Sequence, residues 1–162
     1  MTIAERWGVE DSECERPYPG DARAPSGHAL YRGVTIDAPA ATVFRWLCQL
    51  RAAPYSYDWI DNSGRRSPRQ LTPGLEHLEV GQPVLSIFRL VAFEPDRSMT
   101  MVTRRAKWLF GEMLVDYVVE PIGPARVRLL MKITCTRGWL ALPDLIMARR
   151  QLLNFKGLAE AS

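Results

Sequence analysis

The sequence has only three cysteines, and they lie far apart in the chain. Cys14, Cys48 and Cys135 form no C-x-x-C pair, although thiolate zinc sites and redox motifs use that spacing. An odd number of widely separated cysteines also fits poorly with a disulfide framework. The sequence therefore predicts no metal site and no disulfides, implies no cofactor, and favours a reducing cytoplasm.

Long apolar runs are missing as well. A membrane-spanning helix needs about 20 apolar residues, and no stretch of the 162-residue chain approaches that length. The segment MTIAERWGVEDSECERPYPGD at the amino terminus carries acids where a signal peptide would have its apolar run. We therefore expect a soluble, unexported cytoplasmic protein with no stable membrane insertion.

The chain also lacks a dense stretch of one charge. It has 21 basic and 18 acidic residues and a net charge of +3. Adjacent arginines occur only at 65–66, 104–105 and 149–150, whereas nucleic-acid binding usually requires a continuous basic stripe. No glycine-rich phosphate loop and no G-x-S-x-G elbow is present either. We expect no nucleic-acid partner.

Length and composition indicate one domain. Hydrophobic residues make up 47% of the chain, which is enough for one sizeable core at this length. Residues 1–29 are rich in proline, glycine and charge, a composition that gives turns and extended chain. We expect an N-terminal arm over residues 1–29, anchored by Trp7, and a single domain over residues 30–162.

The first part of that domain predicts a strand followed by helices. The segment LYRGVTIDAP is rich in β-branched and aromatic residues and stops at Asp37 and Pro39, which is typical of a strand. In APAATVFRWLCQL the apolar residues recur at spacings of three and four, so a helix is expected to begin near Pro39. The polar, turn-rich residues 62–82 predict a long surface loop.

Four segments after that loop alternate as antiparallel strands do. They are PVLSIFRLVAFEP, which fits one bent strand or two short ones, then MTMVTRR, GEMLVDYVVEP and ARVRLLMKITCT. The last is the clearest, and its inward positions are Val127, Leu129, Met131, Ile133 and Cys135. Glu112 and Asp116 share the opposite face of the preceding strand, so we expect both carboxylates to face water.

The last segment predicts a long amphipathic helix, because LPDLIMARRQLLNFKGLAEAS has Pro143 and Asp144 in its first turn and an apolar stripe after them. The order of elements predicts an α+β helix-grip fold: a curved antiparallel sheet wraps around the C-terminal helix, and two short helices follow the first strand. Such packing leaves an apolar cavity between sheet and helix.

Several strings in this order resemble the START-like (SRPBCC) superfamily, which includes polyketide cyclase/dehydrase and lipid-transport proteins. They are RWGVEDSE with PGD, VTIDAPAATVFRWLCQL, YSYDWIDN, LEVGQPV and MARRQLLNFKGLAE. Together they look like one mostly uncharacterised bacterial branch of that group. The resemblance implies a helix-grip fold and a hydrophobic ligand cavity, but no single chemistry.

Our first hypothesis is that the domain binds a small hydrophobic ligand, either aromatic, polyketide-like or lipid-like, as a monomer or a homodimer. The proposed cavity walls are Trp46, Tyr55, Tyr57, Trp59, Met101, Tyr117, Met131 and Phe155. Aromatic rings can stack on a ligand and methionines adapt to its shape. The same aromatic residues can instead anchor the core, and the Tyr117 hydroxyl can bond either a ligand carbonyl or a protein group.

The alternative hypothesis is a cyclase/dehydrase-type enzyme. Its candidate catalytic residues are Tyr57 and His77 as proton carriers and Asp58 as the group that orients them. Asp58 can equally cap a helix or pair with an arginine, and His77 can simply lie on the surface. A third possibility is an interaction module that uses the segment RRAKWLF, residues 104–110, on a membrane or protein.

Overall fold

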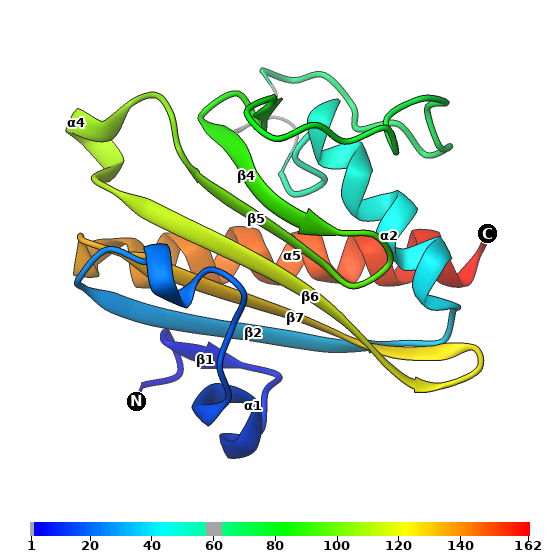
Figure 1. Ribbon diagram of the computed structural model, residues 1–162, viewed down its shortest axis with the longest axis horizontal. Helices are drawn as coiled ribbons and strands as arrows, with labels where there is room; N and C mark the ends of the chain where they lie inside the picture. The colour runs from blue at the N-terminus through cyan, green and yellow to red at the C-terminus, as the bar shows by residue number, and fades with distance from the viewer. Residues whose placement is uncertain (1, 58–62) are drawn as a thin grey trace.

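A seven-stranded sheet packed on one long helix forms the centre of the computed structural model, which describes residues 2–57 and 63–162 (Figure 1). The strands are β1 (Arg6–Trp7), β2 (His28–Ile36), β3 (Pro83–Val84), β4 (Phe88–Glu94), β5 (Ser98–Thr103), β6 (Met113–Gly123) and β7 (Arg126–Cys135). The helices are α1 (Asp11–Glu15), η1 (Asp21–Arg23), α2 (Ala40–Cys48), η2 (Gln49–Arg51), α4 (Lys107–Phe110), η3 (Gly138–Leu140) and α5 (Ala141–Glu160). Across the sheet the strand order is β1-β2-β7-β6-β5-β4-β3.

The two-residue period of β7 sets the inner face of the sheet. Val127 and Leu129 are completely buried and Ile133 nearly so, and β7 pairs with β2 on one side and β6 on the other, both antiparallel. Alternate residues of a strand point to the same face. The apolar set that the sequence predicted as inward therefore packs together in the main core.

The long helix α5 lies along the inner face of the sheet (Figure 1). It begins at Ala141, so Pro143 stands in the first turn, where its missing N–H leaves no helical bond unmade. Leu152 and Phe155 are completely buried against the core. The predicted helix-grip architecture is confirmed, including the helical segments α2 and η2 directly after β2.

One detail of the sheet differs from the prediction. The short strand β1 pairs with β2 in parallel, through Arg6 opposite Tyr31, so the sheet is mixed and not purely antiparallel. The amide of Tyr31 donates to the Glu5 carbonyl at 2.7 Å, and the two-residue strand β1 stands at the edge of the sheet beside β2, where a very short edge strand offers little backbone for pairing with another chain. The segment PVLSIFRLVAFEP forms two strands, β3 and β4.

The N-terminal segment covers the outer face of the sheet. Cys14 and Tyr18 pack there against Tyr31 and Leu130 in a second, smaller apolar cluster. Asp116 of β6 lies under the same cover and is completely buried. The expectation that Asp116 faces water is therefore wrong, because the arm folds over this face of the sheet, whereas Glu112 is exposed as expected.

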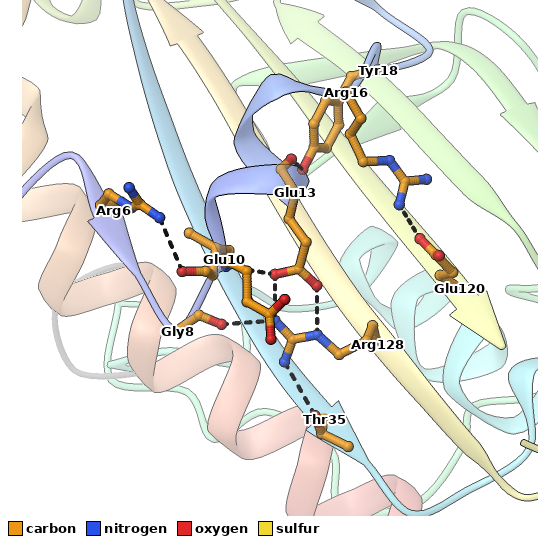
Figure 2. Close-up of polar contacts among 10 residues, drawn as sticks. Arg6, Gly8, Glu10, Glu13, Arg16, Tyr18, Thr35, Glu120 and Arg128 are labelled. Atoms are coloured by element: carbon orange, nitrogen blue, oxygen red, sulfur yellow. Dashed lines mark hydrogen bonds and ion pairs between the residues drawn. The ribbon is translucent and has the colours of Figure 1, made fainter. Parts of the chain in front are cut away.

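Ion pairs fasten this segment to the sheet (Figure 2). Arg128 of β7 donates through Nε and Nη2 to the two carboxylate oxygens of Glu13, at 2.8 and 2.7 Å, and also to the Gly8 carbonyl and the Thr35 hydroxyl. Burial alone would raise the pKa of Glu13, but its bonds to Arg128 and to the Glu10 amide, with the charges of Arg128 and Arg16, together outweigh that effect and hold the pKa below its ordinary value. Paired, half-buried geometry of this kind is the strong form of a salt bridge.

Replacing Arg128 with methionine is expected to lower the free energy of unfolding by about 2–4 kcal/mol, because Glu13 and the Gly8 carbonyl both lose their partner in a partly buried site. The matched control is Arg126→Met on the same strand, whose pair with Asp37 is 58% exposed on both sides. Its loss should stay below about 1 kcal/mol. Equal losses in urea unfolding of the two variants would contradict this ranking.

Candidate functional site

A cavity of about 580 Å³ lies between the inner face of the sheet and the first half of α5. Residues 50–54 and 56 after α2 and the turn 85–88 form one side of it, and α4, η3 and the start of α5 form the other. Its walls are mostly apolar, with Leu30, Val115 and Ile133 from the sheet. The volume falls within the range of about 300–1,000 Å³ that is typical of small-molecule sites.

The cavity has a polar pair on its wall. The Tyr117 hydroxyl of β6 donates to Gln151 Oε1 of α5 at 2.5 Å, and Gln151 Nε2 donates to the Pro54 carbonyl at 2.7 Å. Burial strongly raises the pKa of Tyr117, so its hydroxyl stays neutral. The chain itself therefore supplies the partner that Tyr117 needs, and a ligand can reach this pair as a second partner.

A second polar group on the wall is Asp144, in the first turn of α5. Its carboxylate accepts a hydrogen bond at 2.9 Å from Arg32 Nη2 of β2, a guanidinium that is completely buried. Burial raises the pKa of Asp144 to about 6, against the lowering effect of Arg32. Arg32 also donates to the carbonyls of Tyr31 and Ala4. An ionisable carboxyl thus stands in an apolar cavity, poised to change charge near neutral pH.

Backbone strain gathers at the rim of the cavity. Leu85 and Ser86 have φ values of 48° and 40°, a region that non-glycine residues seldom occupy. Leu85 and Ser86 line the cavity, and so does Trp139, whose side chain is 54% exposed. Strained backbone of this kind clusters at ligand sites because the surrounding structure must be built to hold it.

The structure brings some of the predicted wall residues to the cavity and places others elsewhere. Met101, Tyr117 and Met131 line it. Trp46, Tyr55 and Phe155 do not line it; their rings pack in one aromatic cluster, with centroids 6.1 Å apart for Trp46 and Tyr55 and 5.4 Å apart for Tyr55 and Phe155.

The remaining predicted site residues are not in the described walls of the cavity. Tyr57 lies outside them, with the Arg150 guanidinium 5.8 Å from its ring centre. His77 is exposed, and its backbone carbonyl accepts a bond from Arg51. Asp58 and Trp59 lie outside the described residues. Neither Tyr57 nor His77 is therefore positioned to act on a molecule inside this cavity.

Sequence reasoning missed three polar residues of the site. Gln151 occupies the buried stripe of α5, three residues after Ala148 and four before Phe155, and a polar residue in an apolar stripe is a usable signal. Arg32 stands in the middle of a mostly apolar strand, which is a similar signal. Asp144 was explained entirely by its favourable place at a helix start, so nothing pointed to the cavity.

Other kinds of site are not found in the described ranges. No group of three or more His, Cys, Asp or Glu side chains there could hold a metal ion. The three cysteines are free and buried. No helix within residues 2–57 and 63–162 is long and apolar enough to cross a membrane.

Comparisons with known proteins show the fold. No family model matches the chain, and no curated protein matches it. Among solved structures, protein MLL2253 from Mesorhizobium loti aligns over 83% of this chain and 98% of its own with a TM-score of 0.57 and 15% identity. Hypothetical protein jhp0584 from Helicobacter pylori aligns over 89% and 96%, with a TM-score of 0.55 and 13% identity.

A third similar structure is the di-domain ARO/CYC BexL from the BE-7585A biosynthetic pathway. The alignment covers 82% of this chain and 46% of BexL, with a TM-score of 0.56 and 15% identity. The chain therefore spans about half the length of that di-domain protein. Identities this low establish a shared fold and leave the chemistry of each protein to its own site.

Proposed function

We propose that this chain binds a small hydrophobic molecule, of an aromatic, polyketide-like or lipid-like class, in the cavity between the sheet and α5. The observation that carries the proposal is the cavity itself: about 580 Å³ of space with predominantly apolar walls inside the domain. Apolar space of this size is costly to leave unfilled, because the surrounding side chains lose packing contacts. A ligand that removes its own apolar surface from water restores them.

The polar groups of the wall support a ligand with one or two polar atoms. Tyr117 and Gln151 present a hydrogen-bonded pair from β6 and α5, and Asp144 presents a carboxyl held by Arg32. A few convergent polar groups in an apolar pocket fix the orientation of a ligand. A carbonyl or hydroxyl on an otherwise apolar skeleton matches both pairs.

The test is native mass spectrometry of the purified protein, followed by denaturation and identification of any released molecule. We expect a bound apolar molecule, or saturable binding of the neutral dye N-phenyl-1-naphthylamine with enhanced fluorescence. A protein that is empty as purified and gives no saturable dye binding would contradict the proposal.

A second candidate function is catalysis of a cyclase/dehydrase type on such a ligand. It is favoured by the Asp144 carboxyl, whose pKa of about 6 suits proton transfer near neutral pH, and by the fold shared with the ARO/CYC BexL. In this proposal Asp144 takes the proton-carrying role that the sequence suggested for Tyr57 or His77. The cavity folds the substrate so that its reacting atoms lie close together.

Replacing Asp144 with asparagine separates the two functions. For an enzyme, the variant should keep the dye affinity of the parent and lose turnover by about a hundredfold or more, the usual contribution of a general acid or base. Turnover is followed by mass spectrometry of the molecule that co-purifies. The control is His77→Ala on the exposed loop, which should leave both quantities unchanged. Conversion that is equal in parent and Asp144→Asn would remove Asp144 from the chemistry.

A further inference from the structure

A second concave site lies on the outer face of the sheet, at one end of β4 and β5, and it is strongly basic. This pocket of about 310 Å³ is bordered by Arg23 of η1, Arg89 of β4, Arg104 after β5, and Lys107 of α4. Among the described residues that border it, Glu112 is the one carboxylate. The border therefore carries an excess of three positive charges, as large as the net charge of +3 of the whole chain.

The fold places two of these cations side by side. Arg89 lies opposite Val102 in the antiparallel pair of β4 and β5, and Arg104 follows two residues later, with its amide bonded to the Ile87 carbonyl at 2.6 Å. Residues in that diagonal relation share a face of the sheet, and their long side chains come within reach of each other. Like charges so placed repel, so this arrangement costs stability unless something compensates it.

The protein supplies little compensation. Glu112 contacts Lys107 at 3.3 Å, which neutralises one cation. In the described part of the chain, no hydrogen bond or ion pair engages the guanidinium groups of Arg23, Arg89 and Arg104. Three arginine forks facing one hollow, each with free N–H donors, form an arrangement that suits a multivalent oxyanion.

The N-terminal arm is held in a position from which its own cation, Arg23, borders the pocket. Asp116 on the outer face of β6 accepts bonds from the Gly20 amide at 3.1 Å and from the Thr100 hydroxyl at 2.5 Å. Arg23 follows Gly20 by three residues, and its own amide bonds the Gly20 carbonyl. The buried carboxyl of Asp116 therefore holds η1, and with it Arg23, over the basic end of β5.

We propose that Arg23, Arg89, Arg104 and Lys107 form a binding site for a phosphoryl-bearing anion with two or more negative charges. Guanidinium groups bind phosphate oxygens in pairs of parallel hydrogen bonds, and the pocket volume is at the lower end for small-molecule sites. The same chemistry occurs in a free diphosphate and in the headgroup of an acidic phospholipid. Trp108 follows Lys107 and is exposed, as a side chain that contacts a lipid surface would be. The experiment therefore tests the lipid headgroup beside the free anion.

The experiment uses the full chain and two probes at low ionic strength, where charge-dependent binding is strongest. The probes are sodium pyrophosphate, by calorimetric titration, and phosphatidylcholine vesicles with or without phosphatidic acid, by co-sedimentation. One-site binding of pyrophosphate is expected, and Arg89→Gln and Arg104→Gln should each weaken it about tenfold or more, as for loss of a charge-assisted hydrogen bond. Dye binding in the apolar cavity should not change.

The matched control is Arg97→Gln, which removes the same charge from the turn at the far end of the β4–β5 hairpin, where Arg97 is exposed and pairs with Glu94. Its affinity should change less than about twofold. Arginine-dependent binding only to vesicles that contain phosphatidic acid supports the site and identifies a lipid headgroup as its source. Absence of saturable binding to either probe, or an equal effect of Arg97→Gln and Arg89→Gln, would overturn the proposal.

Discussion

Replacing Ala148 with phenylalanine is expected to weaken binding of N-phenyl-1-naphthylamine by close to a hundredfold. Ala148 is 4% exposed and lines the cavity from the middle of α5, so a ring at this position occupies space that the ligand needs. If the ligand loses roughly 100 Å² of apolar contact, the cost is about 2.5 kcal/mol at 25 cal/mol per Å². That free energy corresponds to a change in affinity of nearly two orders of magnitude.

The measurement is a fluorescence titration of parent and variant at equal protein concentration. Ala161→Phe is the matched control, because Ala161 lies at the exposed end of α5, away from the cavity wall. Extra volume in a packed region can cost about 1–3 kcal/mol, so circular dichroism must first show that Ala148→Phe is folded. Ala148→Leu adds a smaller side chain without a ring, and its loss of dye affinity should be intermediate between parent and Ala148→Phe. Undiminished dye affinity in both Ala148 variants would place binding outside this cavity.

The architecture was readable from the sequence because its signals are local and periodic. The alternation of β7 and the first turn of α5 with Pro143 each depend on neighbouring residues only. The path of the arm was not readable, because it depends on contacts such as Arg128 with Glu13, 115 positions apart. Burial of Asp116 follows from that path, and for this reason the prediction for its carboxyl failed.

The site was less predictable than the fold. Aromatic residues near the end of α2 drew attention because of their type, yet residue type does not distinguish a cavity wall from a core anchor. Tyr55 has a φ of 54°, and its ring packs between Trp46 and Phe155, an outcome set by a backbone turn that the sequence does not announce. Met101 and Tyr117 reached the cavity because strand alternation fixed their side of the sheet.

The other large effect is expected at the buried guanidinium of Arg32. Arg32→Met should lower the free energy of unfolding by about 3–5 kcal/mol at about pH 8, because Asp144 then carries a charge without a partner. The carbonyls of Tyr31 and Ala4 also lose a donor, and an unpaired buried acceptor adds to the loss. Since Ala4 belongs to the N-terminal segment, the variant should also loosen that segment from the sheet.

The loss should depend on pH through Asp144. Its pKa is raised from 3.8 to about 6, so its favourable contribution to stability is complete below about pH 4 and disappears as the pH rises through 6. The Arg32 charge currently lowers that pKa, so in Arg32→Met it rises further and the charged form costs more. Near pH 5 the variant holds Asp144 protonated, and the deficit relative to the parent should shrink by about 1 kcal/mol or more.

Urea unfolding at the two pH values measures this difference directly. The reference for this effect is the single variant Asp144→Asn: the double variant Arg32→Met with Asp144→Asn also lacks this carboxyl, so the difference in unfolding free energy between these two variants should be the same at both pH values. Arg126→Met, at the exposed pair with Asp37, should show a small loss that is also independent of pH. A deficit for Arg32→Met that is equal at both pH values would mean that lost packing and carbonyl bonds, and not the charge of Asp144, make Arg32 necessary. Asp144 would then no longer qualify as the titrating group of the cavity.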